Sequence, residues 1–216
     1  PPPPPHHGPA PRGELRARAV VSNLLPEATA RLLGASADSD DVLAPLQRKV
    51  EGGWGAAMLY RVLAADAVPT RKHAHHVELV ATPNEAFVEG NHVFCSLSGE
   101  DEDRVASEPG ARTLTVSTHV PMRKLLAMRQ AEQGAYVSEV QQRMRETISR
   151  LAPELDAGVR LEMTGSPRTF ARFTGRPQGY VGGVPRRAGL GNYRVLTPTR
   201  LRPAFYLCGD TCFPGQ

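Results

Sequence analysis

The chain has 216 residues, of which 40% are hydrophobic and 22% charged, a composition typical of a folded globular protein and not of a disordered one. Its formal net charge is +4, and such a mildly basic balance fits a nucleic acid, an anionic membrane surface or an anionic cofactor equally well. No stretch approaches the roughly 20 apolar residues of a membrane-spanning helix, the first residues lack the apolar run of a secretory signal, and three cysteines do not make a disulfide framework.

The first fifty residues predict a proline-rich tail followed by alternating strand and helix. Residues 1–13 are expected to be disordered. The predicted elements are a short buried strand over 19–22, a helix over 26–33 and a helix over 42–50. Gly34 ends the first helix, and the Gly52–Gly53 pair follows the second.

The middle of the chain predicts a block of strands and one long helix. The strands cover residues 54–62, 76–80, 91–97, 113–120 and, after the helix, 159–163. The helix is predicted to begin after Gly134, because apolar residues then recur at helical spacing as far as Leu151. A last buried parallel strand is predicted over 204–208. This order favours a mixed sheet inserted into a larger α/β framework.

The strand over 204–208 leads into a glycine-rich ending, residues 209–216. Ligands of open α/β sheets bind beyond the carboxyl ends of strands, where a glycine lets the backbone come close to the ligand. A carboxylate such as that of Asp210 accepts hydrogen bonds from ribose-like hydroxyls. An ordinary turn explains the Gly-Asp pair equally well, so spacing alone leaves both interpretations open.

Residues 163–202 hold eight arginines and no acidic residue. An arginine recurs every four positions from Arg168 to Arg176, so a helical turn would place these three on one face. Phe170 and Phe173 are then expected to point toward a core. Such a segment either binds an anionic partner such as a nucleic acid or forms a solvated basic face.

Histidine and cysteine clusters predict no metal site. The histidines at positions 73, 75 and 76 have no acidic or cysteine partner nearby in sequence, and Cys208 and Cys212 lack the further ligands of a structural zinc site. A surface turn and free thiols account for these residues.

Several stretches taken together resemble the carotenoid desaturase and isomerase branch of the FAD-dependent, amine-oxidase-like flavoproteins (the phytoene desaturase family), with the closest likeness to carotenoid 3,4-desaturases. They occur in family order and are most specific over 169–183 and at the end of the chain. The matching stretches are 19–23, 54–60, 75–76, 89–94, 114–119, 169–183 and 209–216. The resemblance implies an α/β fold of the amine-oxidase and glutathione-reductase type. An α+β substrate domain is inserted there in a Rossmann-like FAD-binding framework, which is incomplete here.

By this resemblance, residues 14–50 are a remnant of the FAD-binding domain, 51–165 form the substrate-binding domain, and 166–216 return into the FAD-binding domain. Family members carry a glycine fingerprint for the ADP half of FAD before the first matching stretch, and they continue past the last one. We therefore expect the chain to be a C-terminal portion of such an enzyme. By itself it should bind FAD poorly and be inactive.

The implied activity is desaturation of a polyene, in which a C–C bond loses two hydrogens and FAD accepts the hydride. Cis–trans isomerisation of a carotenoid by the same fold and cofactor is the alternative. An alternative of another class is a non-catalytic basic module for nucleic acid or an anionic membrane. A carotenoid substrate implies peripheral membrane association, with no nucleic acid partner, at the cytoplasmic face of a bacterial membrane or in a plastid.

The family pattern also assigns site residues, although it names no catalytic base and no metal ligand. The implied FAD contacts are Gly209, Asp210, Phe213, Pro214, Gly215 and Gln216. The implied substrate contacts are Trp54, Tyr60, Arg176 and Tyr180.

Overall fold

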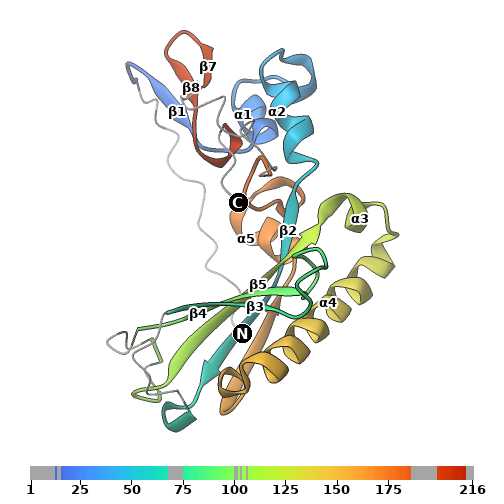
Figure 1. Ribbon diagram of the computed structural model, residues 1–216. Helices are drawn as coiled ribbons and strands as arrows, with labels where there is room; N and C mark the ends of the chain where they lie inside the picture. Colours follow the sequence, from blue (N-terminus) through green and yellow to red (C-terminus); the bar gives the residue numbers. More distant parts are fainter. Residues whose placement is uncertain are drawn as a thin grey trace.

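A computed structural model describes residues 13, 16–67, 75–99, 102, 104–105, 107–185 and 199–212 (Figure 1). Most of the predicted tail, residues 1–12, lies outside the described residues. The described part contains a three-stranded sheet, a five-stranded sheet and five α-helices, which confirms the mixed α/β class.

The small sheet joins strands from near the beginning and the end of the described chain. Its strands are β1 (Val20–Ser22), β7 (Thr199–Arg202) and β8 (Phe205–Leu207), in the order β1-β8-β7. β1 runs parallel to β8, and β7 runs antiparallel to β8. Helices α1 (Pro26–Leu32) and α2 (Leu43–Val50) accompany this sheet, and Ala30, Leu43 and Leu207 are fully buried in their shared core.

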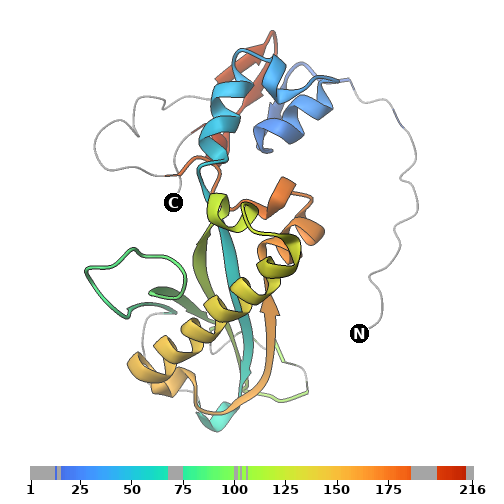
Figure 2. The ribbon, with the colours of Figure 1, turned by 90° about the vertical axis from the view of Figure 1, so that its right-hand side faces the viewer.

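The large sheet is antiparallel throughout. Its strands are β2 (Trp54–Leu63), β3 (His76–Val80), β4 (His92–Leu97), β5 (Arg112–Pro121) and β6 (Val159–Gly165), in the order β3-β4-β5-β2-β6. The long helix α4 (Gln130–Leu151) runs along one face of it (Figure 2). Alternate residues of β5 are buried, as expected for a strand with one covered face. Leu59, Val116 and Met144 lie in the core between helix and sheet.

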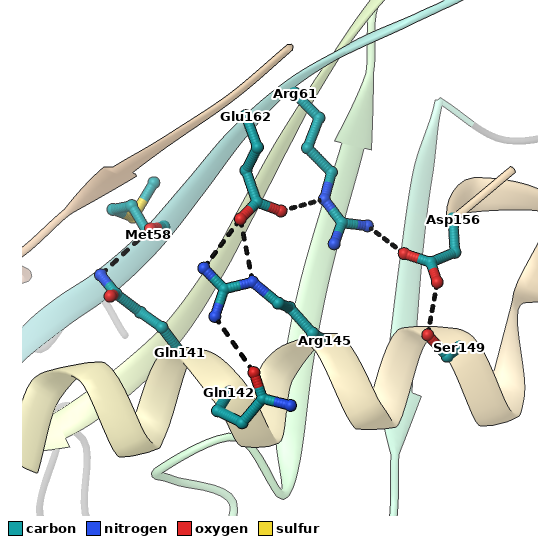
Figure 3. A network of polar contacts seen from close by, with 8 residues as sticks. All are labelled: Met58, Arg61, Gln141, Gln142, Arg145, Ser149, Asp156 and Glu162. Atoms are coloured by element: carbon teal, nitrogen blue, oxygen red, sulfur yellow. Dashed lines mark hydrogen bonds and ion pairs between the residues drawn. The ribbon is translucent and has the colours of Figure 1, made fainter. Parts of the chain in front are cut away.

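An ionic network fixes α4 on β2 and β6 (Figure 3). Nε of Arg61, whose side chain is 3% exposed, donates to Oε2 of Glu162 at 2.7 Å, and its Nη1 donates to Oδ1 of Asp156 at 2.9 Å. Nε of Arg145 on α4 donates to the other carboxylate oxygen of Glu162 at 2.9 Å, and Ser149 on α4 bonds to Asp156. Burial alone would raise the pKa of Glu162. Hydrogen bonds and charges of the two arginines outweigh that effect and leave its pKa below the usual value.

Two helices differ from the sequence prediction. α4 begins at Gln130, so Gly134 lies inside the helix and not before it. The cause is the first turn, where the Glu132 carboxylate accepts from the backbone N–H of Arg129 and satisfies a donor that the helix leaves unpaired. Helix α3 (Met122–Leu126) and strand β7 were not predicted, because both are short and carry little periodicity.

The arginine-rich segment forms a helix that is shorter than its arginine spacing suggested. Helix α5 (Pro167–Thr174) ends at Gly175, which has a φ of +69° in the left-handed region. Arg176 therefore lies beyond the helix, and the prediction that it shares a helical face with Arg168 and Arg172 is wrong. Phe173 is 70% exposed, so its predicted place in a core is also wrong.

Candidate functional site

The carboxyl ends of β1 and β8 form one edge of the small sheet, because the two strands are parallel. The N–H of Cys208 donates to the carbonyl of Ser22 at 2.9 Å and ties the two strand ends together. Gly209 follows with a φ of +84°, and a Cβ built there would have only Asn23 Cβ within 4 Å, at 3.7 Å. Ligands of α/β sheets bind at this kind of edge. Among the residues that the structure describes, none blocks a ligand from coming close to the backbone of Gly209.

Asp210 stands next to this edge and is held from two sides. Nη2 of Arg176 donates to its Oδ2 at 2.9 Å, and the N–H of Val184 donates to its backbone carbonyl at 2.8 Å. The close approach of these segments requires Gly183, which has a φ of +57° and whose Cβ would lie 2.4 Å from that carbonyl oxygen. Both side chains of the Arg176–Asp210 pair are 26% exposed, so the pair is fixed yet reachable from solvent.

Trp54 and Tyr180 lie beside this ion pair. Nη1 of Arg176 donates to the carbonyl of Tyr180 at 3.3 Å, and the N–H of Val181 donates to the carbonyl of Trp54 at 2.8 Å. Tyr180 is 4% exposed, and its hydroxyl donates to the carbonyl of Glu51 at 3.4 Å. Burial, assisted by the negative charge of Glu51, raises the pKa of Tyr180, which therefore stays protonated at neutral pH. Of the predicted substrate contacts, Arg176 thus pairs with Asp210, and the backbones of Tyr180 and Trp54 are linked to it through residues 180 and 181.

Tyr60 is the fourth and lies elsewhere, six residues along β2 from Trp54, or about 20 Å. It belongs to a row of exposed and half-buried apolar side chains on the sheet face turned away from α4. We call it the β2–β6 strip, and it consists of Met58, Tyr60, Val62, Leu161 and Met163. Tyr60 pairs with Met163 and Val62 with Leu161 across the two strands. Leu161 and Met163 are 51% and 58% exposed although both are large and apolar.

Leu161 and Met163 were not among the predicted site residues. The signal was present, because apolar and charged residues alternate along β6, but alternation alone does not tell a covered face from an open one. Trp54 lies on the same face as the strip, since it is separated from Met58 and Tyr60 by an even number of residues, and its ring lies 5.7 Å from that of His119. Trp54 and the strip therefore lie on the same face of the large sheet.

Four of the predicted cofactor contacts, Phe213, Pro214, Gly215 and Gln216, lie outside the described residues, as does His73. The ring of His76 stacks on that of Phe94 at 5.4 Å. Within the part of the chain that is described, no three His, Cys, Asp or Glu side chains gather as a metal site would require. No helix in that same part has the length and apolar character needed to cross a membrane.

Comparison with known proteins finds similarity to prolycopene isomerases of plants. The chloroplastic prolycopene isomerase of Arabidopsis thaliana is 36% identical over 67 residues, which are 31% of this chain and 11% of that protein. The chloroplastic prolycopene isomerase of Daucus carota is 27% identical over 156 residues, which are 70% of this chain and 25% of that protein. The chain thus spans a quarter or less of the length of these relatives. No family model matches the chain, and no solved structure gives a significant match.

These partial matches support a relationship to the carotenoid desaturase and isomerase family. They are matches to isomerases, and nothing in them distinguishes a likeness to 3,4-desaturases.

Proposed function

We propose that this chain forms part of a flavin-dependent carotenoid oxidoreductase, and that the favoured activity is cis–trans isomerisation of a polyene. The similarity to prolycopene isomerases over 70% of the chain is the observation that carries this proposal. The chloroplastic relatives favour a plastid as the place of action. Desaturation of a polyene is the second candidate, supported by the resemblance of residues 169–183 and 209–210 to carotenoid desaturases.

The β2–β6 strip is where we place the polyene. Met58, Tyr60 and Val62 on one strand lie beside Leu161 and Met163 on the next, and Tyr60, Leu161 and Met163 are the exposed members of this apolar group. An apolar polyene laid on it would remove its own surface and that of these side chains from water, which is favourable at about 25 cal/mol per Å². On β2 the strip extends from Met58 to Val62, or about 13 Å, which is long enough to hold part of an extended ligand.

The edge at Gly209 and Asp210 is where we place part of the FAD. The residues fit, because Gly209 leaves room for close approach and the Asp210 carboxylate can accept hydrogen bonds from ribityl or ribose hydroxyls. Bound there, FAD would supply the electron-accepting ring for the reaction. Arg176 fixes the orientation of the Asp210 carboxylate, Tyr180 keeps its proton, and Trp54 joins this region to the strip.

Polyene binding can be measured with Trp54, because it is the only tryptophan of the chain and lies on the same sheet face. A polyene whose absorption overlaps the emission of tryptophan accepts its excitation energy, so such a polyene bound on the strip should quench Trp54 fluorescence. Leu161→Ser and Met163→Ser should each weaken binding about fivefold, from loss of roughly 1 kcal/mol of apolar burial. Leu32→Ser, at an apolar site on α1 that is 67% exposed, is the matched control and should leave binding unchanged.

Equal quenching by the strip variants and the original chain would place the polyene elsewhere. Incubating a full-length version of the protein with FAD and a cis-polyene, followed by chromatography of the products, separates the two candidate reactions. A change of isomer without new absorbance at longer wavelength supports isomerisation. New long-wavelength absorbance shows added conjugation and would establish desaturation instead.

A further inference from the structure

Helices α3, α4 and α5 border a cavity of about 680 Å³ beside the end of β6. Figure 2 shows α3 and α5 next to the beginning of α4. None of the residues to which we assign contacts with FAD or with the polyene lines this cavity. A molecule bound in it would therefore be additional to the cofactor and the substrate.

Glutamine side chains supply hydrogen-bonding groups in the wall of the cavity. Gln130, Gln133 and Gln141 belong to α4, and Gln178 follows α5. Gln141 is only 6% exposed. Its Nε2 donates to the carbonyl of Gly165 at 2.8 Å, whereas its Oε1 has no hydrogen-bond partner in the part of the chain that the structure describes. This nearly buried acceptor gains a partner when a ligand brings an N–H or O–H into the cavity.

The lining carries one positive charge and no negative one. Arg168 lines the cavity, no Asp or Glu does, and no ion pair engages Arg168 among the described residues. Ser166 and Thr169, in the N-cap and first turn of α5, line the cavity too. The start of a helix has unpaired N–H groups and a partial positive charge, both of which favour an anion. This side of the cavity is therefore suited to a phosphate group next to Arg168.

The remaining wall is apolar. Leu125 and Leu126 line it from α3, and Val137 lines it from α4. A hydrocarbon would fit these side chains but would leave Arg168 and Oε1 of Gln141 without partners. Inorganic phosphate would pair with Arg168 but would leave the apolar wall uncovered. The ligand must therefore combine an anionic group, hydrogen-bond donors and an apolar body.

We infer that this cavity binds a mononucleotide. The phosphate meets Arg168 and the start of α5, and the flat base covers the leucines of α3. The glutamine amides, which both donate and accept, match the mixed donors and acceptors of a base edge. The cavity volume lies within the range of roughly 300 to 1,000 Å³ that is usual for small-molecule sites. This inference does not depend on the proposed enzymatic function.

Isothermal titration calorimetry of the 216-residue chain tests the inference. The probes are AMP, GMP, CMP and UMP, compared with the corresponding nucleosides, ribose 5-phosphate and inorganic phosphate. At least one mononucleotide should bind, at least about tenfold more tightly than its nucleoside, ribose 5-phosphate or inorganic phosphate. No binding of any of the four mononucleotides would overturn the inference. Equal affinity for a nucleoside or for ribose 5-phosphate would overturn it as well, because phosphate and base are both required.

Variants locate the bound nucleotide. Arg168→Gln should weaken mononucleotide binding about tenfold and leave nucleoside binding unchanged. Arg172→Gln is the matched control, because Arg172 lies one turn further along α5, is exposed and does not line the cavity. It should bind like the original chain, and equal losses in the two variants would overturn the inference as non-specific attraction of charge.

Filling the cavity is an independent test. Gly134 lines it from α4, and nothing lies within 4 Å of a Cβ built there. Gly134→Phe should therefore place a ring in the cavity and abolish mononucleotide binding, while circular dichroism checks that the variant is folded. A folded Gly134→Phe variant that binds like the original chain would place the nucleotide elsewhere and overturn the inference.

Discussion

Replacing Glu162 by glutamine tests the ionic network that fixes α4 on the large sheet. The carboxylate accepts from Arg61 at 2.7 Å and from Arg145 at 2.9 Å, and glutamine keeps the shape but loses the charge. Breaking a fully buried ion pair costs about 3 to 5 kcal/mol. Glu162 is 21% exposed and Arg61 retains Asp156, so we expect a loss of about 2 kcal/mol in the free energy of unfolding at pH 7.

The assay is urea unfolding of both proteins from pH 7 down through the acid range. The pKa of Glu162 in the folded chain is below its ordinary value of 4.5, so its contribution is present above that pH and is lost as the pH falls through the folded value. The difference between the two proteins should therefore shrink in acid. Glu27→Gln, which breaks the exposed pair with Arg31, is the control and should cost less than about 1 kcal/mol. Equal stability of Glu162→Gln and the original chain at pH 7, or a difference that does not change in acid, would refute this account of the network.

Three further outcomes are expected. Gly183→Ala should lower the free energy of unfolding by at least about 2 kcal/mol. Alanine is strained at the left-handed φ of this position, and its Cβ would collide with the Asp210 carbonyl. Urea unfolding measures the loss, and an unchanged midpoint would contradict it. Gly134→Ala, inside α4 with nothing within 4 Å of the new Cβ, should instead raise stability by about 0.5 to 1 kcal/mol in the same assay. Burial raises the pKa of Cys95 to about 12, so mass spectrometry after brief alkylation at pH 8 should find Cys95 unmodified while the half-buried Cys208 reacts; early labelling of Cys95 would show that the sheet core opens readily.

Elements with strong periodicity could be predicted from the sequence. The β3 limits agree with the prediction, those of β2 and α1 differ by one residue at one end, and those of β5 differ by one residue at each end. Such segments show their pattern locally, as alternation in strands and as a proline start with a glycine end in α1. The start of α4 was predicted too late because Gly134, which lies inside the helix, resembles a helix boundary. The helix begins earlier, at Gln130, because the Glu132 carboxylate accepts a hydrogen bond from the backbone N–H of Arg129.

The site was harder to predict because its parts meet only through tertiary structure. Arg176 and Asp210 are 34 positions apart, and no local pattern joins them. Spacing suggested a helical role for Arg176, and the left-handed Gly175 overrode it by ending α5. The assignment of FAD and polyene contacts stays a prediction, as does the division of the chain at residues 50 and 165.

The parallel pairing of β1 with β8 has a consequence for how the chain folds. The two strands are separated by nearly the whole described sequence, so their pairing can form only after a very large loop has closed. In the large sheet, β3 and β4 are consecutive in the sequence and pair with each other. Their pairing therefore closes a short loop and loses much less chain entropy. We expect the small sheet to form last during refolding and its amide hydrogens to exchange soonest. The edge at Gly209 therefore forms only after the rest of the fold is in place.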